Sequence, residues 1–151
     1  MVRLAGVTLD AIKNRHSVVL GMTRSGKTYF TGHVLERLQD NGVHTMFVDP
    51  KADKEYERLG TVCNTPMEVY AQLLKKNPRI VFRTEGDQSE RNEMLDQVIQ
   101  IMFNLQRSDG FKRIRRVIAI DEIQLYTKKG STRAIEYIWT VGAGIGITGM
   151  A

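Results

Sequence analysis

The chain has 151 residues and a mass of 17.2 kDa, which is the usual size of a single domain. Hydrophobic residues make up 42% and charged residues 26%, which excludes a disordered chain and a collagen-like repeat. The formal net charge of +5 suits a polyanionic partner but does not identify one.

Apolar runs of strand length alternate along the chain with segments of helical period. A helix is expected over residues 27–40, where apolar side chains recur every three or four residues. Thr65 before Pro66 is a favourable helix start, and Asp87 with Glu90 forms a capping-box pattern at the start of another helix. Strands are expected over 16–20, 43–48, 79–83, 116–120 and 145–150, and further helices from 66 to 74, from 87 to about 110 and over 131–139.

The order of these segments predicts the fold class. Strands that are separated by helices pair in parallel, because the chain must cross over between them. The strands are also almost continuously apolar, as expected when helices cover both faces of a sheet. The sequence therefore predicts an α/β three-layer sandwich with a mostly parallel sheet.

The cysteine count and the hydropathy bear on location. Cys63 is the only cysteine, so an internal disulfide is excluded and a reducing cytoplasm is favoured. No apolar run approaches the ~20 residues that a bilayer-spanning helix needs. We therefore expect a cytoplasmic protein without an integral membrane segment.

Residues 21–28 match the phosphate-loop pattern G-x-x-x-x-G-K-[ST] (Walker A) at every fixed position. Gly21 and Gly26 allow backbone angles that point successive N–H groups into one concavity, and the next helix adds its positive end. Lys27 can then reach the β- and γ-phosphates, and the Thr28 hydroxyl can bind Mg²⁺. The alternative is a chance match in a turn, but this pattern follows a strand and opens a helix. The expected nucleotide-binding residues are Gly21, Met22, Thr23, Arg24, Ser25, Gly26, Lys27 and Thr28.

Asp121 and Glu122 follow an apolar strand, at the edge of a parallel sheet where ligands bind. We expect Asp121 to hold Mg²⁺ together with Thr28. Glu122 is expected to accept a proton from the attacking water, so Lys27 and Glu122 are the expected catalytic residues. The alternative is that the two acids merely begin a solvated turn.

The acidic pair also discriminates between enzyme classes. A carboxylate beside the γ-phosphate favours water as the nucleophile, whereas a kinase must exclude water. The pair therefore indicates a Mg²⁺-dependent ATPase and disfavours a P-loop kinase.

The same residues carry a resemblance to the HerA/FtsK superfamily of DNA-pumping ATPases. Residues 16–28 resemble its first strand and phosphate loop, and residues 47–51 (FVDPK) resemble the DPK element that ends its second strand. Residues 119–125 resemble its hydrolytic (Walker B) strand, and residues 144–147 resemble the glycine-flanked approach to the next core strand. The compact size is similar to genome-packaging ATPases of tailless viruses and to plasmid-borne relatives.

This resemblance implies a P-loop NTPase of the additional-strand catalytic-glutamate (RecA-like) type. It also implies ATP and Mg²⁺ as cofactors, double-stranded DNA as a partner and a homo-oligomeric ring, hexameric in the family. The implied function is an ATP-hydrolysing DNA translocase, most specifically a viral genome-packaging subunit. Capsid or membrane vertex proteins would then be further partners, and the host cytoplasm or the virion the location.

Two departures from the family pattern stand out. Family members often carry an arginine in the glycine-containing stretch before the last segment, but residues 141–146 have none. The family also continues past that segment with a polar sensor and another strand, whereas this sequence stops at Ala151. We therefore expect residues 1–151 to form a single P-loop ATPase core that ends before the last core strands. A second interpretation stays open: a nucleotide-gated binding or assembly module with little autonomous turnover.

The densest basic cluster precedes the acidic pair and comprises Lys112, Arg113, Arg115 and Arg116, with Lys128 and Lys129 beyond it. It is expected either to contact DNA phosphates or to form a solvated loop. The absence of aromatic alternation favours duplex DNA over a single strand. The candidates for an arginine that acts on a neighbouring subunit are Arg24, Arg83, Arg107 and Arg133, for which salt bridges are the other explanation.

Other polar and aromatic residues are explained by packing. The three histidines have no Cys or carboxylate at ligand spacing, so a zinc site is not expected. Cys63 is expected to be a small buried residue, and Trp139 to pack a helix. Two roles are open for Asp49 and Lys51. They either line the nucleotide edge or a subunit interface, or they cap a helix or form salt bridges.

Overall fold

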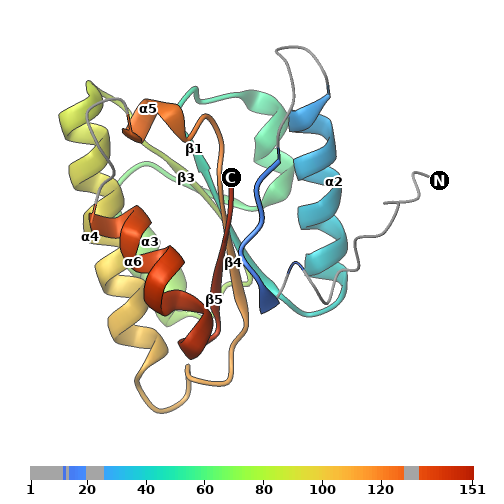
Figure 1. Cartoon of the computed structure of the whole chain (residues 1–151), viewed down its shortest axis with the longest axis vertical. Coiled ribbons are helices and arrows are strands. Elements are labelled where there is room, and N and C mark those ends of the chain that lie inside the picture. The colour runs from blue at the N-terminus through green and yellow to red at the C-terminus, as the bar shows by residue number, and fades with distance from the viewer. Residues whose placement is uncertain (1–11, 13, 20–25, 128–132) are drawn as a thin grey trace.

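Figure 1 shows the computed structural model, in which a parallel sheet lies between two layers of helices. The structure describes residues 12, 14–19, 26–127 and 133–151. The strands are β1 (His44–Asp49), β2 (Thr61–Cys63), β3 (Arg79–Arg83), β4 (Arg116–Ile120) and β5 (Ile147–Met150). The helices are α2 (Lys27–Asp40), η1 (Lys54–Leu59), α3 (Pro66–Leu74), α4 (Gln88–Gln106), α5 (Gln124–Thr127), α6 (Arg133–Val141) and η2 (Gly142–Ile145). The predicted α/β three-layer fold is confirmed.

The five strands are all parallel and lie in the order β2-β3-β1-β4-β5. The segment before the phosphate loop continues the sheet beyond β5. Ser17 forms a parallel bridge with Met150, and its N–H donates to the carbonyl of Gly149 at 2.9 Å. One strand, β5, therefore separates this segment from β4, which leads to the acidic pair. This inserted strand is the arrangement that the RecA-like type implies.

Each face of the sheet has its own hydrophobic core. α2 and η1 cover one face, where Leu35 and Leu38 pack against Phe47. α3, α4 and α6 cover the other face, where Val48 and Ile118 are completely buried. Successive strand residues point to opposite faces, so β1 contributes to both cores and its residues 46–48 are apolar at every position. Burying each such aliphatic side chain contributes about 1.5–3 kcal/mol.

Helix boundaries follow the capping signals closely. Thr65 accepts a hydrogen bond from the Glu68 N–H at the start of α3, and the Asp87–Glu90 capping box forms at the start of α4. Both caps satisfy N–H groups that a helix leaves unpaired at its first turn. The expected bounds of α2, β3 and β4 are met, whereas β5 begins at Ile147 because the preceding glycine-rich stretch forms η2.

Four short elements lie where no such element was expected: η1, β2, α5 and η2. Their lengths of six, three, four and four residues are too short to show a period in the sequence. The expected strand over 16–20 appears as the single bridge at Ser17, and position 20 lies outside the described residues. The expected helix over 131–139 is seen from Arg133, since residues 131 and 132 also lie outside them.

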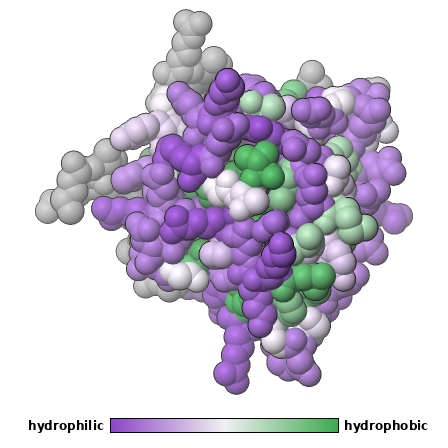
Figure 2. Space-filling model, turned by 180° about the vertical axis from the view of Figure 1, so that it is seen from behind, coloured by the Kyte–Doolittle hydropathy of each residue, from purple (hydrophilic) through white to green (hydrophobic). Residues whose placement is uncertain are grey.

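The surface is predominantly hydrophilic on the side opposite to the view of Figure 1, with a few small apolar patches between polar side chains (Figure 2). Within the described ranges, no helix combines the length and the apolar character needed to span a bilayer.

Candidate nucleotide site

Four of the expected site residues meet at one cavity of about 220 Å³. Lys27 and Thr28 enter it from the first turn of α2, and Asp121 and Glu122 enter it from the end of β4. The end of β5 and the segment 18–19 close the other side. The remaining expected loop residues, Gly21, Met22, Thr23, Arg24 and Ser25, lie outside the described residues.

The N-terminus of α2 is suited to bind an anion. Gly26 precedes it with a φ of 84°, a left-handed conformation that favours glycine. As a glycine, Gly26 supplies no capping side chain, and the first turn carries no acidic residue. Lys27 and Thr28 are exposed there. The positive end of the helix dipole therefore lies at the place where the phosphate-loop motif expects phosphates.

Asp121 and Thr28 share a hydrogen-bond partner in Tyr56. The Tyr56 hydroxyl donates to Asp121 Oδ2 at 3.3 Å and also bonds the Thr28 side chain. Burial, followed by the charge of Glu122, raises the pKa of Asp121 above its usual value. A nearby cation would offset both effects by favouring the ionised carboxylate. The hydroxyl and carboxylate oxygens also fit Mg²⁺, which prefers oxygen ligands and keeps several waters.

Glu122 is held by two side chains. Lys51 Nζ donates to Oε1 at 2.5 Å, and the Gln124 amide donates to the other carboxylate oxygen. The hydrogen bond from Lys51 is the main reason that the pKa of Glu122 is lowered, so the side chain is an ionised carboxylate at neutral pH. Glu122 also has a φ of 51°, an unusual conformation for a residue with a side chain. Such strain is found where surrounding structure fixes a functional residue.

Asp49 and Arg83 support the loop that carries Lys51. The Asp49 side chain is 0% exposed and accepts hydrogen bonds from the N–H groups of Lys51 at 3.0 Å and Asp53 at 2.9 Å. Arg83 Nε lies 3.6 Å from Asp49 Oδ2, an ion pair without a hydrogen bond. Burial raises the pKa of Asp49, while the two N–H bonds and Arg83 oppose that rise. Of the two roles expected for Asp49 and Lys51, the structure shows capping and salt-bridging.

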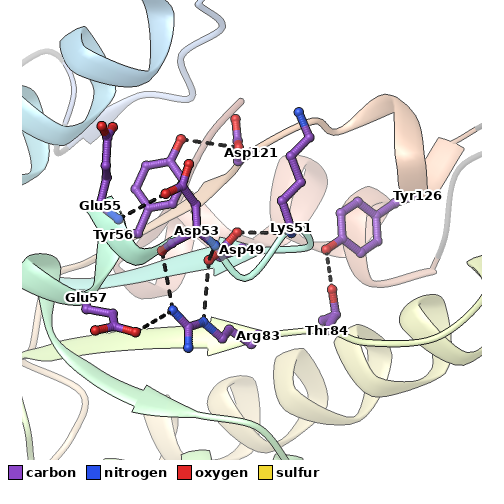
Figure 3. Close-up of polar contacts among 10 residues, drawn as sticks. All are labelled: Asp49, Lys51, Asp53, Glu55, Tyr56, Glu57, Arg83, Thr84, Asp121 and Tyr126. Carbon is purple, nitrogen blue, oxygen red and sulfur yellow. Dashed lines mark hydrogen bonds and ion pairs between the residues drawn. The ribbon is translucent and has the colours of Figure 1, made fainter.

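Arg83 is engaged within its own chain. Its Nη2 donates to the Asp53 carbonyl at 3.3 Å and to Glu57 Oε1 at 3.0 Å (Figure 3). Arg107 donates to the Tyr137 hydroxyl at 3.3 Å, and Arg133 is exposed on the surface. Of these expected arginines, Arg83 therefore has the salt-bridge role, and Arg24 lies outside the described residues.

The basic cluster lies at the opposite edge of the sheet from the acidic pair, because Arg116 begins β4 and Asp121 follows its end. Five strand residues separate these edges by about 16 Å. Including Arg116 in a DNA-contacting surface is wrong, since its side chain is buried and donates to Gln106. Burial lowers its pKa to about 10.

The exposed members of the basic cluster line two surface grooves. Arg113 and Arg115 contribute to both grooves, while Lys112 lines one and pairs with Asp109 at 2.6 Å. Their arrangement suits a polyanion better than a compact ligand, because the positive charges are spread along a surface. Lys128 and Lys129 lie outside the described residues.

Sequence reasoning missed Tyr56 as a site residue. Tyr56 lies in η1, a helix too short to show a period, and it stands in the charged segment KEYERL. The only signal is an isolated aromatic residue among charged ones, which does not reveal that its hydroxyl reaches Asp121. By contrast, Cys63 is buried and Trp139 packs, stacking on His16 at 5.3 Å, as expected.

Comparisons with known proteins agree with this geometry. The model of the TraG P-loop domain family matches residues 3–139. No curated protein matches the chain at a significant level. The genome packaging NTPase B204 from Sulfolobus turreted icosahedral virus 2, in complex with AMP, is similar at 17% identity with a TM-score of 0.68, over 91% of this chain and 64% of B204.

Other complexes of B204 give the same result. The sulfate complex has a TM-score of 0.70 and the ATP-gammaS complex 0.65, each at 16% identity over 91% of this chain and 63% of B204. The chain therefore spans less than two thirds of the B204 chains that it matches, and a likeness at this identity is evidence of the fold. The family match and the inserted strand together lead to one conclusion: the chain belongs to the TraG P-loop domain family and has a P-loop NTPase fold of the HerA/FtsK type.

Proposed function

We propose that the chain is the ATP-hydrolysing core of a double-stranded DNA translocase, and specifically of a viral genome-packaging subunit. The observation that carries the hydrolytic part is the cavity that Lys27, Thr28, Asp121 and Glu122 share. These four side chains come from two segments about ninety residues apart, and they are the residue types that phosphoryl transfer to water needs.

Each of these residues has a distinct task. The triphosphate binds at the N-terminus of α2, where the phosphate loop supplies N–H groups and Lys27 neutralises the β- and γ-phosphates. Thr28 and Asp121 hold Mg²⁺, which when bound offsets charge on the phosphate oxygens. Glu122 orients a water and accepts its proton. Lys51 and Gln124 each donate to one oxygen of Glu122, and the second lone pair on each oxygen can still accept from a water.

The same contacts favour a second candidate function. The hydrogen bond from Lys51 lowers the pKa of Glu122, which makes the carboxylate a weaker base toward water, and the protein would then hold Mg·ATP with little turnover. Such a protein would be a nucleotide-gated binding or assembly module. The two candidates differ in turnover, not in nucleotide binding.

The DNA part of the proposal rests on the basic loop and on B204. Arg113 and Arg115 line exposed grooves at the edge of the sheet opposite the cavity, where backbone phosphates could bind. B204 is described as a genome packaging NTPase. By analogy we propose a homo-oligomeric ring, hexameric as in the HerA/FtsK superfamily, with capsid or vertex proteins as further partners and the host cytoplasm or virion as its place.

The hydrolytic proposal is tested by ATP hydrolysis and ATP binding in purified variants. We expect Lys27→Ala to lose both activities, and Glu122→Gln to keep binding while its rate falls by about 10²–10⁴-fold, because it lacks the general base. Glu85→Gln is the matched control, an exposed glutamate outside the cavity. A Glu122→Gln variant that hydrolyses ATP at the wild-type rate would contradict the role of Glu122.

A further inference from the structure

Tyr56 joins the two side chains that we assign to Mg²⁺. Its ring is 3% exposed and packs against Phe47 with ring centroids 4.1 Å apart. Its hydroxyl donates to Asp121 Oδ2 at 3.3 Å (Figure 3). The same hydroxyl also bonds the Thr28 side chain. The hydroxyl thus restricts the orientation of the Asp121 carboxylate.

Hydrogen bonds from neighbouring residues also fix η1, the short helix that carries Tyr56. Asp53 caps η1 by accepting from the Glu55 N–H at 3.0 Å, and the Asp53 N–H is bonded to the buried Asp49. Arg83 then ties the Asp53 carbonyl to Glu57, at the far end of the same turn. Figure 3 shows these contacts as one continuous network below Tyr56. A ring that is packed and a backbone that is capped leave the hydroxyl little freedom to move.

We propose that Tyr56 is a positioning residue for the cation, which holds the Asp121 carboxylate in the orientation that binds Mg²⁺ beside Thr28. This inference rests on the proposed nucleotide site and adds a residue to it. Tyr56 acts through Asp121 and does not contact the nucleotide. Hydrogen-bond partners of this kind orient metal ligands, and their removal lowers metal affinity about 10–100-fold.

The test separates cation binding from nucleotide binding. A fluorescent, non-hydrolysable ATP analogue is titrated into the wild type and Tyr56→Phe, once with Mg²⁺ and once with EDTA. We expect the two proteins to bind equally in EDTA, whereas Tyr56→Phe loses about tenfold of the affinity that Mg²⁺ adds. Tyr70→Phe, which removes a hydroxyl from α3, is the matched control and keeps the wild-type gain.

The outcomes distinguish this inference from the proposed function. Phe keeps the ring against Phe47, so we expect an unchanged unfolding temperature for Tyr56→Phe. If Tyr56→Phe keeps the full Mg²⁺-dependent gain while Thr28→Ala loses it, Tyr56 only packs and the inference is wrong. If the wild type itself shows no Mg²⁺-dependent gain, the proposed Mg·ATP site is wrong, and the inference is wrong with it.

Discussion

Asp49 is 0% exposed, and it is the one acidic residue in the described part of the chain that is buried. It connects three parts of the site, because it bonds the N–H groups of Lys51 and Asp53 and pairs with Arg83. The sequence predicted Asp49-Pro50 as a strand end. It did not predict the buried charge, because the partner Arg83 lies on a strand that only the folded sheet places beside β1.

We predict that Asp49→Ala lowers the free energy of unfolding by about 3–5 kcal/mol, because it leaves two N–H groups and a largely buried guanidinium without their partner. Chemical denaturation at neutral pH measures the change. Asp87→Ala is the control: it removes an exposed aspartate with a single capping role, at a cost of about 1 kcal/mol. Equal effects of the two substitutions would show that Asp49 is only a local cap.

Among the elements, β5 is attached to the segment that leads into the phosphate loop by both backbone and side-chain contacts. His16 Nδ1 accepts a hydrogen bond from the Gly149 N–H at 2.9 Å, and its ring stacks on Trp139. Gly149 has no room for a side chain, since an added Cβ would lie 2.5 Å from the Trp139 ring. The side-chain contact between this segment and β5 therefore depends on a neutral imidazole, because only an unprotonated Nδ1 can accept the hydrogen bond from Gly149.

Burial lowers the pKa of His16 below its ordinary 6.5, so the folded protein favours the neutral form. The contribution of the neutral His16 to the free energy of unfolding is therefore present above about pH 6.5, and it is lost as the pH falls through the lower pKa of the folded state. We predict that the free energy of unfolding falls between pH 7.5 and pH 5.5, and falls less in His16→Gln, which can still accept but does not titrate. His33→Gln, on α2, should keep the wild-type dependence; an unchanged pH dependence in His16→Gln would contradict this role.

The helices and strands differ in how well they could be predicted from the sequence. Elements with their own local signals were recognised, such as α4, whose capping box marks its start, although it ends at Gln106 and not near residue 110 as expected. η1, β2 and α5 were missed because long-range contacts, not a period of their own, stabilise them. Lys27, Thr28, Asp121 and Glu122 could be named as candidates because the phosphate-loop motif and the acids at a strand end each stand in consecutive residues. Tyr56 was missed because only the fold brings it to Asp121.

The molecule as a whole has two candidate functional edges at opposite ends of the strands of one sheet. The candidate nucleotide cavity lies at the carboxyl ends of the strands, and the basic grooves of Arg113 and Arg115 lie at the amino ends. β4 connects these edges directly, since it runs from the basic loop to the acidic pair. If DNA binds at the basic edge, β4 is therefore the direct route within one chain to the acidic pair.

The most direct test of a DNA-dependent ATPase is the rate of ATP hydrolysis with and without linear double-stranded DNA, at low and high salt. We predict that DNA raises the rate of the wild type, that added salt removes the increase, and that Lys27→Ala shows no hydrolysis. The Arg113→Ala/Arg115→Ala double variant should show a smaller ratio of the rates with and without DNA than a Lys54→Ala/Lys75→Ala control. Tight Mg·ATP binding without turnover in either condition would contradict the account and leave a nucleotide-gated module.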